Sequence, residues 1–152
     1  MADPLRKQIR DAVKTAVETV TAFESRVYIG RHDALPPDQM PAAAVFLGDE
    51  KLEKASGGGG TVQYQVELEV AVEAYAKQAG DTLPEEQLDA YRESIIAAVV
   101  ADPTLGGIVL DISPTGAVHM ESSDGAVNLG NLTVTFTALY FETRTPTPPA
   151  EE

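Results

Sequence analysis

The clearest hydrophobic pattern in the chain is a strict alternation of apolar and polar residues over 62–74. Apolar side chains occupy every even position, and all but one of the odd positions between them are polar, namely Gln63, Gln65, Glu67, Glu69 and Glu73. A period of two predicts a β-strand with one buried face and one face toward water or a partner. At ~3.3 Å per residue the segment 62–75 would span about 46 Å, as much as a compact domain of this size is wide. The strand must therefore bend or project, and a projecting strand invites pairing with a second copy.

Two other segments have the three- and four-residue spacing of amphipathic helices. The first covers residues 4–24, and its apolar stripe is Leu5, Ile9, Val13, Val17, Val20 and Phe23. The second runs from about Thr82 to Ala101, and Thr82 with Glu85 predicts a capping box at its start. Each helix has one apolar side to bury against a sheet.

The remaining apolar runs are shorter and predict strands at 27–29, 42–47, 108–112, 117–120 and 132–141. Polar, Gly-rich or Pro-rich stretches predict loops at 31–41, 48–60 and 121–131, with a turn at 114–116. The resulting order predicts an α+β fold, with two helices packed on a largely antiparallel or mixed β-sheet and one long projecting strand or hairpin. We expect one domain over residues 1–142 and a Pro-rich disordered tail over residues 143–152.

Four consecutive glycines, Gly57, Gly58, Gly59 and Gly60, close the polar segment before the long strand. A phosphate-binding loop follows a strand and opens directly into a helix, whereas this one leads into a strand. The glycines therefore predict a flexible loop that becomes ordered in an assembly.

Charge changes this picture because it is large and unevenly distributed. The 152 residues carry a net charge of −13, with +2 over residues 1–31, −5 over 32–80 and −10 over 81–152. Binding to nucleic acid or to an anionic membrane needs clustered Lys and Arg, which the acidic chain lacks beyond its start. The first helix holds Arg6, Lys7, Arg10 and Lys14. These residues form either a solvated face or, for Arg6, Arg10 and Lys14, a contact with an acidic partner.

The sequence offers little for catalysis or metal binding. It has no cysteine, and its two histidines, His32 and His119, fall in different elements. No serine lies in a nucleophile-elbow motif. Glu67, Glu69 and Glu73 share one strand face, but an open face gives carboxylates no difference in environment to separate their pKa values. We therefore expect no enzyme, no cofactor and no metal site. No apolar run reaches a membrane-spanning length and the N-terminus lacks a signal-peptide core, so we expect synthesis in a reducing cytosol.

Several segments together resemble a known family. These are the helix–strand start, Leu35-Pro36-Pro37 before the apolar segment 41–47, the long alternating strand, the helical segment 88–95, and Asp102-Pro103-Thr104-Leu105 followed by a strand, an acidic loop and a Thr-rich closing strand. Over residues 5–142 the chain is similar to tail terminator proteins of long-tailed phages, the lambda-type minor tail proteins. The glycines at 57–60 and the Pro-rich end depart from the family pattern.

The resemblance implies an α+β virion structural protein that assembles as a homo-oligomeric ring, usually a hexamer. Such a ring caps the tail tube at the head-proximal end, stops tube polymerisation and offers a docking surface to the head–tail connector. Its expected partners are copies of itself, the tail tube protein and neck proteins, and DNA passes through the lumen without specific binding. On this reading Gln63, Gln65, Glu67, Glu69 and Glu73 lie near a subunit boundary or the lumen, and assembly occurs in the host cytoplasm. The alternatives are a head-completion (neck) protein, a terminator of a contractile tail, and, from another class, a small-ligand-binding or enzymatic α+β module.

Overall fold

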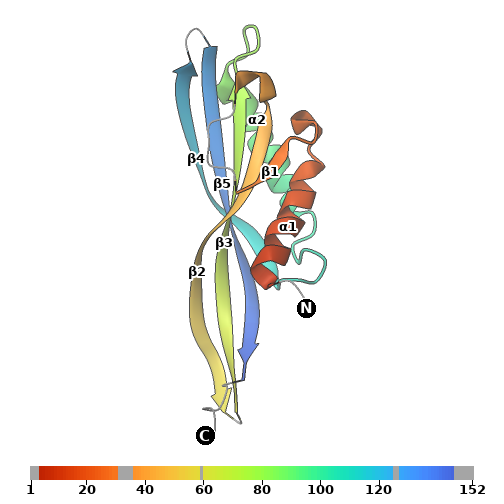
Figure 1. Ribbon diagram of the computed structural model, residues 1–152, viewed down its shortest axis with the longest axis vertical. Helices are drawn as coiled ribbons and strands as arrows, with labels where there is room; N and C mark the ends of the chain where they lie inside the picture. Colours follow the sequence, from red (N-terminus) through yellow and green to blue (C-terminus); the bar gives the residue numbers. More distant parts are fainter. Residues whose placement is uncertain (1–3, 31–35, 59, 125–126, 146–152) are drawn as a thin grey trace, which may run out of the picture.

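The computed structural model describes residues 4–30, 36–58, 60–124 and 127–145. A five-stranded sheet with the order β1-β2-β3-β5-β4 forms one layer, and two helices cover one of its faces (Figure 1). The helices are α1 (Leu5–Glu18) and α2 (Pro84–Val100), and two short 3-10 helices are η1 (Thr21–Phe23) and η2 (Pro37–Gln39). The strands are β1 (Val27–Ile29), β2 (Ala42–Gly58), β3 (Thr61–Lys77), β4 (Asp111–Asp124) and β5 (Val127–Arg144). β1 pairs with β2 in parallel and all other pairs are antiparallel, so the predicted α+β class with a mixed sheet is confirmed.

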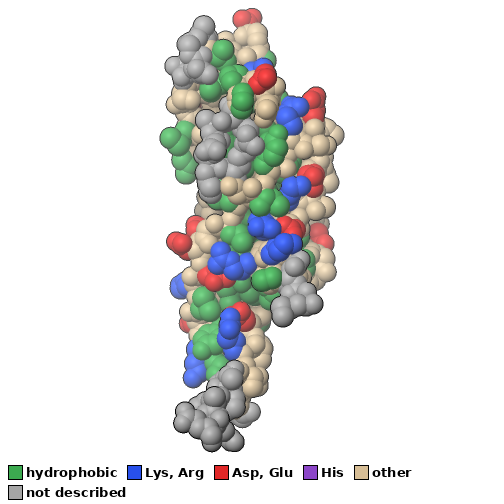
Figure 2. Space-filling model, in the orientation of Figure 1, with side chains coloured by type: hydrophobic (Ala, Val, Ile, Leu, Met, Phe, Trp, Pro, Cys, Tyr) green, Lys and Arg blue, Asp and Glu red, His purple; other side chains and the backbone are tan. Residues whose placement is uncertain are grey.

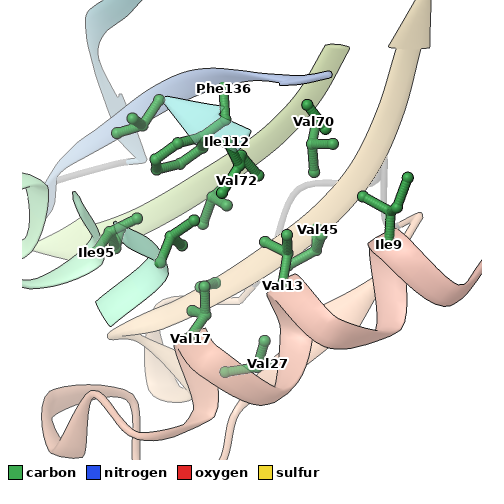
Figure 3. Packing of buried hydrophobic residues seen from close by; sticks show 14 of the residues in the cluster. Ile9, Val13, Val17, Val27, Val45, Val70, Val72, Ile95, Ile112 and Phe136 are labelled. Atoms are coloured by element: carbon green, nitrogen blue, oxygen red, sulfur yellow. The ribbon is translucent and has the colours of Figure 1, made fainter. Parts of the chain in front are cut away.

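The long alternating strand has the orientation that its pattern predicts. From Val66 to Ala76 the even-numbered side chains of β3 are at most 1% exposed, and they face the helices. Val45 of β2 and Phe136 of β5 lie beside them in the sheet, and Ile9, Val13 and Val17 of α1 close the layer from above (Figure 3). The hydrophobic core therefore lies between the helices and the central part of three strands.

Below this core, three strands project as a sheet with no helix on either side (Figure 1). β1 pairs with β2 only at residues 43–45, and β4 pairs with β5 only as far as Leu139. Beyond these points β2, β3 and β5 continue alone, and β5 still pairs with β3 from Tyr140 to Arg144, about 17 Å of strand at ~3.4 Å per residue. We call this part the projecting end. It is narrower than the body, and this view of it shows both hydrophobic and basic side chains (Figure 2).

The loop that we predicted at 48–60 is wrong, because β2 continues to Gly58. Gly57 pairs with Val62 and Gly58 with Thr61, so two of the four glycines lie in a β-ladder. Gly60 has a φ of +86°, a conformation that favours glycine in tight hairpin turns. Gly59 lies outside the described residues. Gly57, Gly58 and Gly60 therefore lie in a hairpin at the tip of the projecting end. The flexibility of this segment and its ordering in an assembly stay a prediction.

Three other local predictions also need correction. The predicted loop at 121–131 is wrong for residues 121–124 and 127–131, because Glu121 to Asp124 pair with the first residues of β5. The predicted turn at 114–116 is a bulge within β4, with a register shift between Pro114 and Gly116. Helix α2 starts at Pro84, so Leu83 and not Thr82 occupies its N-cap, and no side-chain capping bond forms.

The end of the chain is only partly described. β5 reaches Arg144, so Thr143 and Arg144, which we assigned to the tail, pair with β3 as strand residues. Residues 146–152 lie outside the described residues. His32 is likewise outside them.

Candidate assembly surfaces

The row of polar side chains on β3 lies on the sheet face opposite the helices. Gln63, Gln65, Glu67 and Glu73 are half-buried between neighbouring strands, and Glu69 is exposed. β5 places Thr133, Thr137 and Leu139 beside this row, at the positions paired with Glu73, Glu69 and Glu67. A small apolar cluster of Met40, Ala42, Ala44 and Tyr75 covers only the upper end of this face. The predicted row thus lies on one face of a single chain, with the buried Ala71 between Glu69 and Glu73.

Glu73 differs from the other two glutamates of the row. The Tyr75 hydroxyl donates a hydrogen bond to its Oε1 atom, and the Thr133 hydroxyl donates to Oε2 at 3.3 Å. Glu67 and Glu69 make no hydrogen bond or ion pair with another described residue. Glu73 therefore stabilises its own sheet, and Glu67 and Glu69 are the carboxylates of the row that are left for an external contact.

The projecting end also exposes hydrophobic side chains on both of its faces. Leu52 of β2 is 49% exposed and is paired with Val66, whose side chain faces the helix side. Phe141 of β5 is 40% exposed and is paired with Gln65, so it lies on the polar-row side. Neither residue was predicted to be exposed, and Phe141 was expected to be covered. The alternation of Leu52 with charged neighbours was the available signal, but the segment was read as a loop.

A free strand edge borders the body of the domain. β4 pairs with β5 along its length, and its other edge has no strand partner among the described residues. Val118 and Met120 on this strand are each 61% exposed. Unpaired edge groups together with exposed apolar side chains are typical of strands that meet another chain.

The three basic residues that we predicted as a partner contact all lie on α1. Arg6 forms an ion pair with Glu50 of β2 at 3.3 Å, Arg10 with Asp11 at 3.1 Å, and Lys14 with Glu18 at 3.0 Å. Their side chains are 46%, 26% and 26% exposed. Figure 2 shows Lys and Arg side chains gathered over the middle of this face, where α1 lies, with acidic side chains among them. Exposed pairs of this kind contribute little to stability and are easily exchanged for other partners.

A polar contact holds α1 at the border between the body and the projecting end. The Tyr140 hydroxyl donates a hydrogen bond to Glu50 Oε1 at 3.4 Å, and Glu50 also accepts the Arg6 ion pair. Tyr140 is only 4% exposed. Burial, followed by the negative charges of Glu50 and Glu142, raises the pKa of Tyr140 to about 12. The contact therefore requires a protonated tyrosine.

This pKa predicts a loss of stability at alkaline pH. The ordinary tyrosine pKa is 10.0, so between pH 10 and about 12 the folded chain retains a proton that the unfolded chain releases. The stabilisation is complete below pH 10 and is lost as the pH rises toward 12. In urea titrations Tyr140→Phe should show a shallower fall of unfolding free energy across this interval than the wild type. Tyr64→Phe is the control, and parallel profiles for the wild type and Tyr140→Phe would contradict the assignment.

The described residues show little that could support catalysis. No three His, Asp or Glu side chains among them are grouped so that they could hold a metal ion. A hollow of about 390 Å³ between α2 and β4 is lined by Glu85, Leu88, His119, Met120 and Glu121. His119 is exposed there, and its side chain makes no hydrogen bond within the described part of the chain. None of the described helices combines the length and apolarity needed to cross a membrane.

The chain is similar to one protein family and to several solved structures. The family model described as phage minor tail protein U matches residues 5–140. A solved chain from the virion of a native gene transfer agent particle is similar, with 15% identity, a TM-score of 0.42, and coverage of 91% of this chain and 99% of the other. The sheath/tube terminator of an extracellular contractile injection system has 14% identity and a TM-score of 0.42, and the match covers 100% of this chain and 64% of the other. No curated protein sequence matches the chain.

Proposed function

Because the chain belongs to the phage minor tail protein U family, and is therefore a structural protein of phage tails, we propose that it forms a ring that ends the tail tube. The ring contains six copies and lies at the head-proximal end of the tail in the virion. One of its faces matches the last ring of tube subunits and stops further polymerisation. The other face cannot accept a tube subunit and binds the head–tail connector. Its work is steric, through contacts between proteins, and needs no reaction.

The observation that carries this proposal is the projecting end. Three strands extend past the helical layer with both sheet faces uncovered, and Leu52 and Phe141 are exposed there on opposite faces. A lone domain gains nothing from exposing apolar side chains on a sheet of this kind, whereas neighbouring subunits would bury them. The hairpin tip at 57–60 then reaches a neighbouring subunit or the tube.

The charge of the chain supports a lumen through which DNA passes. Each copy has a net charge of −13, so six copies together carry −78. Gln63, Gln65, Glu67 and Glu69 form a polar, partly acidic face without a helix over it. An acidic wall does not bind the phosphate backbone and leaves DNA free to slide. We therefore assign this face to the lumen or to the boundary between subunits, with Glu73 supporting it from within the sheet.

The proposal is tested by the length of tails made by a phage that lacks this gene. The wild-type chain supplied in trans should restore tails of one length, and the double variant Glu67→Lys with Glu69→Lys should leave them long and heterogeneous in negative-stain micrographs. Asp38→Lys with Asp81→Lys makes the same change in net charge at exposed residues outside the row and should restore normal tails. Circular dichroism and thermal unfolding verify that both variants fold.

Two outcomes would count against these assignments in different ways. Normal tails without the gene would disprove the capping function. Normal tails with the Glu67 and Glu69 variant would remove these residues from the functional surface and leave the capping function in place.

A further inference from the structure

The basic residues of α1 lie on the side of the helix that faces away from α2. Ala12 and Ala16 of α1 line an apolar hollow of about 320 Å³ together with Ala98 and Leu105, so this side of α1 faces α2 and the segment after it. Arg10 and Lys14 are each two positions from Ala12. Two positions are ~200° around a helix, nearly the opposite side. Arg6 and Lys7 are three or four positions before Arg10 and belong to the same side. We call these four residues the basic side.

The acidic residues of α2 lie on the side of that helix that faces away from α1. Ala98 of α2 lines the same hollow as Ala12 and Ala16 of α1, so it faces α1. Tyr91 is seven positions before Ala98, about two turns, and therefore lies on the same side of α2, where its ring meets Phe23 of η1 at a centroid distance of 5.3 Å. Asp89 and Glu93 are each two positions from Tyr91, so they lie on the side of α2 that faces away from α1. Both are exposed, as are Glu85 and Glu86 in the preceding turn. We call these four residues the acidic side.

The two sides lie at opposite edges of the domain. Arg6 reaches β2 through its ion pair with Glu50, next to the β1 edge of the sheet. Glu85 lines a hollow with His119 and Glu121 of β4, the strand at the other edge. Glu50, Asp11 and Glu18 pair with the basic side and leave it a small positive excess. On the acidic side, only Arg92 among the described residues pairs with one of the four carboxylates, Glu93. The helical layer is therefore weakly positive at one lateral end and negative at the other.

We propose that copies of this chain associate head to tail, with the basic side of one copy against the acidic side of the next. A two-fold contact would bring like charges together, whereas a head-to-tail contact pairs every positive side with a negative one. The same orientation brings the free edge of β4, with Val118 and Met120, to the boundary between copies. Head-to-tail contacts form a closed ring when the rotation between copies closes, so the inference rests on the proposed ring and supplies its polarity.

The test uses two charge-reversed variants and their mixture. The basic-side variant is Arg10→Glu with Lys14→Glu, and the acidic-side variant is Glu86→Lys with Asp89→Lys. In sedimentation velocity at low ionic strength we expect the wild type to associate with rising concentration. Each variant alone should sediment as a 16.1 kDa chain, with association weakened at least about tenfold. An equimolar mixture should recover wild-type association, because each reversed side then finds its complement in the other variant. A single chain carrying all four substitutions should recover it as well.

The acidic-side variant separates this contact from a general effect of charge. Its two substitutions each add two positive charges and change the net charge from −13 to −9. If overall repulsion controlled association, this variant would associate more strongly than the wild type. Loss of association in a less charged chain therefore indicates a specific contact. Recovery in the mixture also proves that both variants are folded.

Other results would overturn the inference. The first is a wild type that stays a single chain at millimolar concentration, and the second is a pair of variants that associate normally. The third is a mixture of the two variants that does not recover the association of the wild type. The last result would assign the basic side to a different acidic partner. Tail length in the complemented phage is a separate measurement. Normal tails with failed association tests would indicate a ring held by another contact, whereas successful association tests with abnormal tails would indicate a head-to-tail contact without a capping function.

Discussion

Replacing Phe136 with alanine is expected to lower the unfolding free energy by about 3–5 kcal/mol. Phe136 is fully buried at the centre of β5, where it is paired with Val70 of β3. Its ring lies beside Ile112, on the side of the core formed by the sheet (Figure 3). The change removes a ring from a close-packed interior and leaves a cavity that strands on both sides hold open. Since whole domains are stable by only about 5–15 kcal/mol, much of the stability is lost.

Urea-induced unfolding of the purified chain measures this effect. Phe141→Ala is the matched control, because it removes the same side chain five residues further along the same strand, where 40% of it is exposed. The control should change the free energy by less than about 1 kcal/mol. Equal losses of unfolding free energy for Phe136→Ala and Phe141→Ala would contradict the burial of Phe136 and the exposure of Phe141.

The order of elements was predictable because each long element carries its own pattern. The alternation over 62–74 identified the buried face of β3, since apolar residues repeat every second position only when one face meets a core. The three- and four-residue spacing of apolar residues identified α2 in the same way, and the structure buries Leu88, Ile95 and Val99. These signals are local, so a single sequence contains them.

The extended parts of β2 and β4 were not predictable on the same basis. Residues 48–58 are mostly polar or glycine, with Leu52 as the one large apolar residue, and 121–124 are polar too. What makes them strands is the ladder offered by β3 and β5, which satisfies their backbone groups. Tertiary pairing of this kind leaves no pattern in the paired segment itself. The glycines at its end favoured a loop although they form the turn of a hairpin.

The candidate surfaces also differ in whether a local sequence pattern predicts them. The polar row on β3 follows from alternation alone, and the structure keeps Gln63 to Glu73 on one face. The hydrogen bonds that Glu73 accepts from Tyr75 and Thr133 were not predictable in the same way, because Thr133 lies on a strand 60 residues away from Glu73. The separation of charge between α1 and α2 was also not predictable. Helical spacing shows which residues share a side, but only packing shows that Tyr91 and Ala12 face inward.

Replacing Leu52 and Phe141 together with serine is expected to abolish tail capping and leave the fold intact. Their side chains are 49% and 40% exposed on opposite faces of the projecting end, so the single chain loses little by the change. Unfolding free energy should move by less than about 1 kcal/mol. In the proposed ring both residues become buried between subunits, where a few apolar anchors supply most of the binding energy. We expect self-association to weaken by about 100-fold, which corresponds to about 2.7 kcal/mol.

Tail length in the complemented phage and sedimentation of the purified chain measure the two effects together. Ile29→Ser is the control, because this residue of β1 is 40% exposed on the body of the domain, away from the projecting end. The control should cap tails normally. If the Leu52 and Phe141 variant also capped normally and associated like the wild type, the projecting end would not be the surface that joins subunits. The head-to-tail contact between the helices would then have to hold the ring alone, and its charge-reversed variants should lose capping completely.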